Sequence, residues 1–106
     1  MSPAIAAHDP GAMTATLHIE HRITDYPTWR AAFDRFAEHR TSAGVTAHRI
    51  RLVEDDPHHI VIDLDFEAAA AAHAFSTVLH EQVWRTPLSP ALVGEPTTRV
   101  LVAADG

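Results

Sequence analysis

The chain has 106 residues, a formal net charge of −6 at pH 7 and 46% hydrophobic residues. This size predicts one domain, and the composition is typical of a globular protein and excludes wholesale disorder. All eight basic residues are arginines, and they are scattered rather than gathered in a stripe, so no nucleic-acid partner is expected. The absence of cysteine excludes disulfides, thiolate metal ligands and a thiol nucleophile.

The N-terminal segment shows no regular periodicity. Residues 1–12 lack the basic and apolar segments of a signal peptide, which favours a cytoplasmic location. No apolar run approaches the roughly 20 residues that span a bilayer, so no membrane partner is expected. We expect residues 1–13 to form a flexible tail and residues 14–106 to form the domain, with Met1 or Met13 as the physiological start.

The first strand and helix follow this tail. Apolar residues alternate over residues 14–23, which predicts a strand with His21 on its apolar face. A helix is expected after it, capped by Asp25 or Tyr26 and ended by Gly44 in the left-handed conformation. Its apolar positions recur at spacings of three and four and form one wide, largely aromatic stripe. The members of this stripe are Tyr26, Trp29, Ala32, Phe33, Phe36, Ala37 and Arg40.

A hairpin is predicted from two alternating runs, residues 45–53 and 60–66, with residues 55–59 as its loop. A slip by one residue would place arginines opposite apolar side chains and bury carboxylates, so the alternation favours one register. In that register Arg51 faces Asp63, Arg49 faces Asp65, Ile50 faces Leu64 and Leu52 faces Ile62.

The C-terminal half predicts a second helix and a last strand. Residues 67–84 are rich in alanine and carry a helical apolar stripe. Pro87 and Pro90 are expected to end this helix and to open a loop that runs to residues 94–96. Alternation over residues 97–103 then predicts the fourth strand.

The order of these elements is β-α-β-β-α-β. Such a chain builds a ferredoxin-like α+β domain with an antiparallel sheet, and the expected strand order is 4-1-3-2. Both helices then cover one face of the sheet and leave the other face bare. A second copy of the chain is the expected cover, so we predict a homodimer.

Several short motifs resemble those of a known superfamily. They are His21–Tyr26 with Trp29, Phe33–Asp34, Arg40 with Gly44, Asp55–Pro57, Asp65–Phe66, Ala72 with Phe75, and Gly94–Pro96. The pattern resembles the dimeric α+β barrel superfamily over roughly residues 14–103. Within it, the chain is similar to small actinobacterial proteins labelled cyclase or related to antibiotic-biosynthesis monooxygenases. The resemblance implies a dimeric α/β barrel and a pocket between the sheet and its helices. It also implies chemistry without metal or flavin, in which the substrate itself reacts with oxygen.

Two histidines are the candidate catalytic residues. His21 and His48 both lie among apolar residues on the helix-facing side of the predicted sheet. A neutral imidazole there can act as a general base, and the alternative is a core histidine bonded to a backbone carbonyl. The candidate substrate-binding residues shape an apolar slot for a small apolar or aromatic molecule. They are Tyr26, Trp29, Phe33, Phe66 and Phe75.

The remaining polar clusters favour structural roles. The charged ladder of the hairpin fits ion pairs that specify register better than the lining of a site for an acidic ligand. The pair His58–His59 and the pair His73 with His80 lack the spacing of metal ligands, so no metal site is expected. His73, His80 and Trp84 lie on one helix face, which is either solvated or covered by a partner.

Two functional hypotheses remain open. The first is a small cofactor-independent enzyme, of cyclase, isomerase or monooxygenase type, that acts on an aromatic or polyketide-like molecule. The second is a non-catalytic dimeric module that binds a hydrophobic metabolite or a protein partner. A cavity between sheet and helices that is large enough for a bicyclic ligand, with His21 reaching into it, favours the enzyme, whereas a filled, dry core favours the module.

Overall fold

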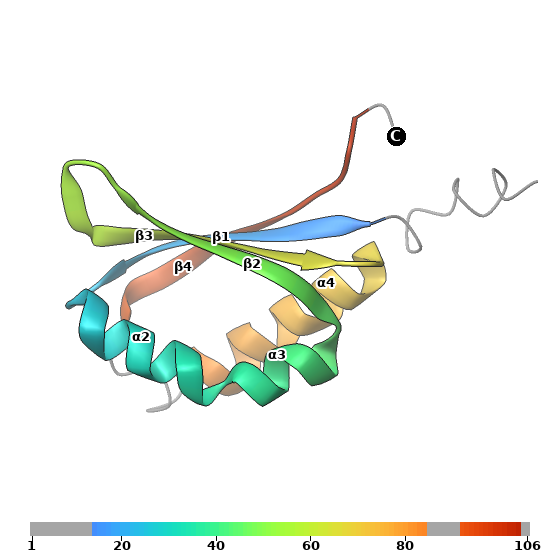
Figure 1. Ribbon diagram of the computed structural model, residues 1–106, viewed down its shortest axis with the longest axis horizontal. Coiled ribbons are helices and arrows are strands. Elements are labelled where there is room, and N and C mark those ends of the chain that lie inside the picture. The colour runs from blue at the N-terminus through green and yellow to red at the C-terminus, as the bar shows by residue number, and fades with distance from the viewer. Residues whose placement is uncertain (1–13, 85–91, 105–106) are drawn as a thin grey trace, which may run out of the picture.

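The computed structural model of the protein describes residues 14–84 and 92–104. The strands β1 (Ala15–Ile23), β2 (Val45–Val53), β3 (Asp56–Phe66) and β4 (Leu92–Leu101) form an antiparallel sheet in the order β2-β3-β1-β4. The helical segments are α2 (Tyr26–Arg35), α3 (Ala37–Ala43), α4 (Ala69–Val78) and the π-helical turn η2 (Leu79–Val83). The helices lie on one face of the sheet and leave the other face uncovered (Figure 1). The predicted α+β class, ferredoxin-like element order and strand order are confirmed.

The core lies between the sheet and the helices. Residues of β1 and β3 alternate between buried and more exposed positions, as the sequence pattern predicts. Leu17 and Ile60 are fully buried, and Phe66 packs near Phe75 of α4 with ring centroids 6.0 Å apart. No helix among the described residues is long and apolar enough to cross a membrane.

The first helical segment differs from the single helix expected over this region. Asp25 caps α2, because its carboxylate accepts a hydrogen bond of 2.8 Å from the backbone N–H of Thr28. The segment breaks at Phe36, whose N–H bonds to the carbonyl of Phe33 at 3.2 Å. Gly44 ends α3 with a φ of +97°, as predicted.

The hairpin register differs from the prediction by two residues. Arg49, not Arg51, lies opposite Asp63, and Ile50 lies opposite Ile62. The turn is shorter than expected, because β3 already begins at Asp56. A register irregularity follows near Pro57, which has no N–H to donate to the ladder. A shift of two residues leaves every side chain on its predicted face, and the expected ion pairs form diagonally across the ladder.

The last strand also begins earlier than predicted. Residues 94–96 belong to β4 rather than to a loop, whereas Pro87 and Pro90 lie outside the described residues. The register between β1 and β4 shifts at this point, so residues 94–96 lie opposite the single residue His21. Gly94 adopts a φ of +76°, which a glycine accommodates without strain.

Candidate functional site

A cavity of about 80 Å³ lies between the sheet and the helices. The sheet supplies one side of it through Ile19, His21, Ile62 and Leu64. The opposite side comes from Trp29, Ala32, Phe33, Phe36 and Arg40 of the first helical segment and Phe75, Leu79, Val83 and Trp84 of the second. The core is therefore not filled here, but the cavity is smaller than the bicyclic ligand that the enzyme hypothesis expects. The volume is below the roughly 300 Å³ at which pockets for drug-sized ligands begin.

His21 is the predicted candidate base that lies in this cavity wall. The side chain is 5% exposed, and its Nδ1 lies 3.4 Å from the carbonyl oxygen of Arg22. A carbonyl oxygen only accepts, so in the neutral ring Nδ1 carries the proton and Nε2 carries the lone pair. Burial lowers the pKa of His21 from 6.5 to about 4, so the imidazole is neutral at pH 7.

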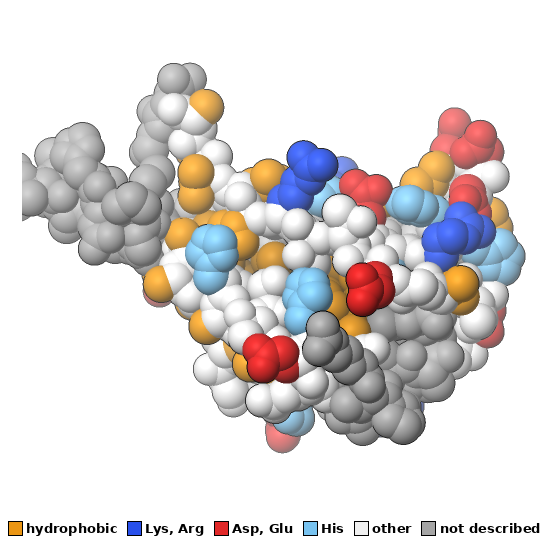
Figure 2. All heavy atoms as spheres, turned by 180° about the vertical axis from the view of Figure 1, so that it is seen from behind, with side chains coloured by type: hydrophobic (Ala, Val, Ile, Leu, Met, Phe, Trp, Pro, Cys, Tyr) orange, Lys and Arg blue, Asp and Glu red, His pale blue; other side chains and the backbone are white. Residues whose placement is uncertain are grey.

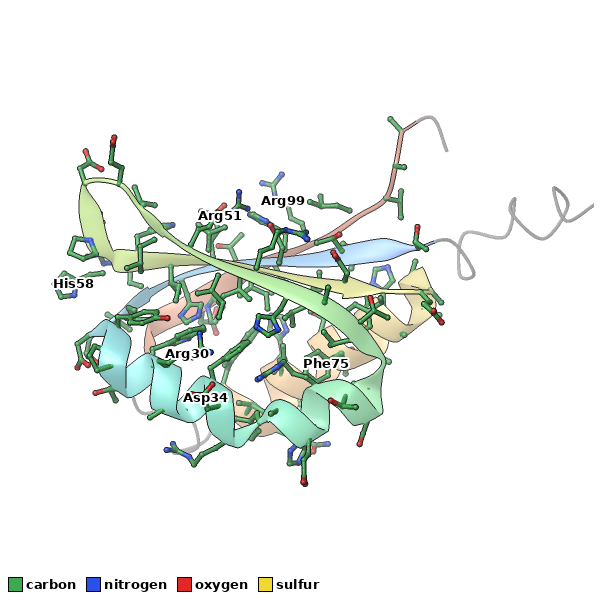
Figure 3. The ribbon with its side chains drawn as sticks, viewed as in Figure 1. Arg30, Asp34, Arg51, His58, Phe75 and Arg99 are labelled. Carbon is green, nitrogen blue, oxygen red and sulfur yellow. The ribbon has the colours of Figure 1, made fainter. Side chains whose placement is uncertain are left out.

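Three of the five predicted substrate-binding residues line the cavity. Trp29 and Phe33 stack on each other with ring centroids 4.9 Å apart, and Phe75 reaches the cavity from α4 (Figure 3). Tyr26 stacks on Trp29 at 5.9 Å but does not line the cavity. Phe66 is fully buried and also lies outside the lining.

His48, the second predicted catalytic residue, does not line the cavity with His21. It lies on the helix-facing side of β2, as expected, and its ring meets Phe33 edge-on at 5.2 Å. However, β2 is at the edge of the sheet and the His48 side chain is exposed to solvent. His48 therefore lies on the expected side of the sheet beside Phe33, but at its exposed edge rather than in the cavity wall, and its catalytic role stays a prediction.

Trp84 is a cavity residue that sequence reasoning placed elsewhere. The structure buries it partly in the cavity wall, with its ring 6.4 Å from that of His21 and 4.8 Å from that of His80. The turn η2 produces this position, because the backbone N–H of Trp84 bonds to Leu79 five residues back at 2.8 Å. A regular helix would have rotated Trp84 to another direction, and the periodicity held no sign of the widened turn.

Arg40 is a second polar residue of the cavity wall, and sequence reasoning gave it no role in the site. The sequence pattern already placed it on the aromatic stripe, and a basic residue on an apolar stripe was the available signal. In the structure Arg40 is 8% exposed, and its guanidinium lies 3.5 Å from the centre of the Phe33 ring. Its Nη1 donates a hydrogen bond of 2.5 Å to the Phe33 carbonyl.

The helix-free face of the sheet carries a connected polar network. Arg51 pairs with Asp63 at 2.6 Å, and His18 lies 2.7 Å from Asp63 and 2.9 Å from Glu20. Because both partners of the His18 ring are carboxylates, both ring nitrogens donate when the ring is charged. The hydrogen bond with Glu20, followed by that with Asp63, raises the pKa of His18 against the opposing effect of burial. Hydrogen bonds from Arg49 and Thr16 lower the pKa of Asp65, because they favour its charged carboxylate.

This network confirms that the predicted ladder forms ion pairs. Figure 3 shows Arg51 and Arg99 on the side of the sheet away from the helices, and Figure 2 shows charged and histidine side chains gathered along that surface. Within residues 14–84 and 92–104 no group of three or more histidine, aspartate or glutamate side chains is arranged to hold a metal ion.

Comparison with known proteins identifies the fold. The chain matches no known protein-family profile and no curated protein sequence.

Among solved structures it resembles SnoaB, a cofactor-independent oxygenase from Streptomyces nogalater, with 16% identity, a TM-score of 0.61 and coverage of 88% of this chain and 97% of that one. A monooxygenase from the gene ActVA-Orf6 of Streptomyces coelicolor, in complex with Nanaomycin D, matches with 13% identity, a TM-score of 0.58 and 92% coverage of both chains. A dimeric ferredoxin-like protein from an uncultured marine organism matches with 12% identity, a TM-score of 0.59 and coverage of 86% and 95%. The TM-scores show a shared ferredoxin-like fold, and at identities this low the likeness shows the fold alone.

Proposed function

We propose that the protein is a small monooxygenase-type enzyme that oxidises an aromatic or polyketide-like molecule without a cofactor. The observation that carries the proposal is the aromatic cavity with a neutral, buried His21 in its wall. Two proteins of the same fold are described as a cofactor-independent oxygenase and a monooxygenase, which supports this choice over a cyclase or an isomerase.

His21 is the proposed general base. Its Nε2 accepts a proton from an acidic position of the substrate, such as an enol or a carbon acid beside a carbonyl. An imidazole with a pKa of about 4 is a weak base, so an acidic substrate suits it. The substrate anion that forms next to the ring then favours the imidazolium, because opposite charges in an apolar site attract strongly.

Molecular oxygen is the proposed co-substrate. The substrate carbanion gives electrons to oxygen and forms a carbon–oxygen bond, which yields a peroxide that takes its proton back from His21. Loss of water from this peroxide converts the original CH₂ group into a ketone, so that CH₂ and O₂ become C=O and H₂O. The substrate supplies all four electrons. The cavity is smaller than a bicyclic substrate, so Trp84 at the end of η2 is proposed to move as the substrate enters.

The proposal is tested by oxygen uptake with anthrone and 1,3-dihydroxynaphthalene as probes. We expect one atom of ¹⁸O₂ in the ketone product, and an acid limb of kcat/KM near pH 4 rather than near 6.5. The variant His21→Gln keeps a polar side chain but removes the base, so kcat should fall about 10²- to 10⁴-fold. His73→Gln, at an exposed position of α4, is the matched control and should keep full activity.

Two results would count against this function. Equal turnover by His21→Gln and the parent protein would remove His21 from the role of base. Binding of both probes without oxygen uptake would favour the non-catalytic module instead. Circular dichroism of each variant must match that of the parent for either conclusion.

A further inference from the structure

Arg40 is a buried cation in the cavity wall that the proposed reaction does not use. Only 8% of the residue is exposed, and the other side chains that line the cavity are apolar or aromatic apart from His21. Placing a charge in such surroundings costs free energy unless an opposite charge accompanies it.

The contacts of Arg40 hold its guanidinium in place but do not neutralise it. Nη1 of Arg40 donates one hydrogen bond to the Phe33 carbonyl, and the centre of the Phe33 ring lies 3.5 Å from the guanidinium carbon. Asp34 is the carboxylate that acts on Arg40 electrostatically, yet its side chain is bound to Arg30 at 3.1 Å. Arg40 forms no ion pair within residues 14–84 and 92–104, and its burial lowers its pKa.

The guanidinium also has N–H groups to spare. Among its nitrogens, Nη1 donates to Phe33, and no buried side-chain nitrogen of the described residues lacks a partner. The remaining nitrogens of Arg40 therefore retain some contact with the cavity or with solvent. A planar guanidinium with free N–H groups matches the two oxygens of a carboxylate.

We propose that the cavity binds an aromatic carboxylic acid, with the carboxylate on Arg40 and the ring along Trp29 and Phe33. This inference rests on the proposed function to the extent that the cavity is taken as the substrate site.

The order of the wall residues defines the orientation of such a ligand. The His21 ring lies 6.5 Å from Trp29, Trp29 lies 4.9 Å from Phe33, and Phe33 lies 3.5 Å from the Arg40 guanidinium. Each of these neighbours lies in the wall of the same cavity, so the two stacked rings connect the candidate base with the cation. A flat acid anchored at Arg40 is therefore proposed to lay its ring system along this wall.

Cinnamate and cinnamamide test this inference, because they have nearly the same shape and differ in charge. The chain has two tryptophans, Trp29 and Trp84, and both line the cavity, so tryptophan fluorescence reports its occupancy. We expect the parent protein to bind cinnamate about 10- to 100-fold more tightly than cinnamamide. Arg40→Gln should abolish this preference and leave the affinity for cinnamamide unchanged.

Two further variants keep the result interpretable. Arg40→Lys retains the charge but not the planar fork, so it should retain part of the preference for cinnamate over cinnamamide. This variant also provides the test if Arg40→Gln fails to fold. Arg35→Gln makes the same change of charge at an exposed position of α2 and should bind both compounds as the parent does. An equal loss in Arg35→Gln and Arg40→Gln would overturn the proposal, since general electrostatics would then explain it.

The remaining outcomes separate this inference from the proposed function. Equal binding of cinnamate and cinnamamide by the parent overturns the acid specificity but leaves the cavity as a binding site. Binding of neither compound overturns both the acid site and the use of the cavity for small aromatic molecules. Oxygen uptake is not needed for any of these conclusions.

Discussion

Two histidines of β1, three residues apart, respond to opposite surroundings. His18 lies on the helix-free face between two carboxylates, which raises its pKa. His21 lies on the core face among aromatic rings, and burial lowers its pKa to about 4. The strand alternation alone decides which environment each side chain meets, because successive side chains of a strand point to opposite faces.

The shifted pKa of His21 predicts a dependence of stability on pH. Between pH 6.5 and about 4 the unfolded chain binds a proton at this residue and the folded chain does not. The free energy of unfolding therefore falls as the pH drops through this window, by about 2 to 3 kcal/mol from this residue. The variant His21→Phe cannot titrate and should lack this part of the loss.

Urea unfolding at pH 7.5 and pH 4.5 measures the effect. The carboxylates contribute equally to both proteins, so the comparison of parent and variant isolates His21. His18→Gln serves as a control of opposite sign. The raised pKa of His18 stabilises the folded state at low pH, and this contribution disappears as the pH rises through the folded pKa, so the variant should lose stability at low pH. Identical pH dependence of the parent and His21→Phe would show that the pKa of His21 is not lowered.

Three local irregularities surround the cavity at the level of secondary structure. At the helix break the Phe33 carbonyl accepts hydrogen bonds from both the Phe36 N–H and Arg40. The widened turn η2 directs Trp84 inward, and the irregularity at Gly94 lies opposite His21. Such departures from regular geometry are frequent at functional sites, which agrees with the proposed role of the cavity.

Gly44 gives a prediction at this scale. Its φ of +97° lies in the left-handed region, and an added Cβ would meet no atom within 4 Å. Gly44→Ala should therefore lower the free energy of unfolding by about 1 to 2 kcal/mol through backbone strain alone. Gly44→Asn should cost less, because asparagine tolerates this conformation better. Chemical denaturation measures both, and an alanine variant as stable as the parent would contradict the assignment of strain.

In the whole molecule, the helix-free face of the sheet is a large surface that no other part of the described chain covers. It combines the polar network around Asp63 with the exposed side chains of Val93, Arg99 and Leu101 on β4. A mixed face of this kind suits a second copy of the chain, since it offers both charges and apolar area. A protein of the same fold is described as dimeric. We propose a homodimer formed through this face.

The dimer predicts a particle of about twice 11.6 kDa in sedimentation equilibrium. Arg99→Glu reverses a charge on the proposed interface, opposite His18, and should shift the particle towards the monomer mass. Arg35→Glu reverses a charge on the exposed side of α2 and should leave the mass unchanged. A folded parent protein that sediments as a monomer in dilute solution would contradict the dimer.

The sequence by itself determined the types of the main elements, their order and the face of the sheet that each side chain of β1 to β3 occupies. These properties follow from local periodicity and capping, as the alternation of β1, Asp25 and Gly44 illustrate. It could not decide the hairpin register, because a shift of two residues keeps Arg51 and Asp63 on the same face.

Only the tertiary structure decided which residues form the cavity. His48 and His21 share the helix-facing side of the sheet, but the edge position of β2 exposes one and the centre of the sheet buries the other. Trp84 reaches the cavity through the widened turn η2, which the periodicity does not show, whereas Arg40 lies on the aromatic stripe that the periodicity does show. Periodicity describes neighbours along one element, whereas a cavity is what several elements leave unfilled between them.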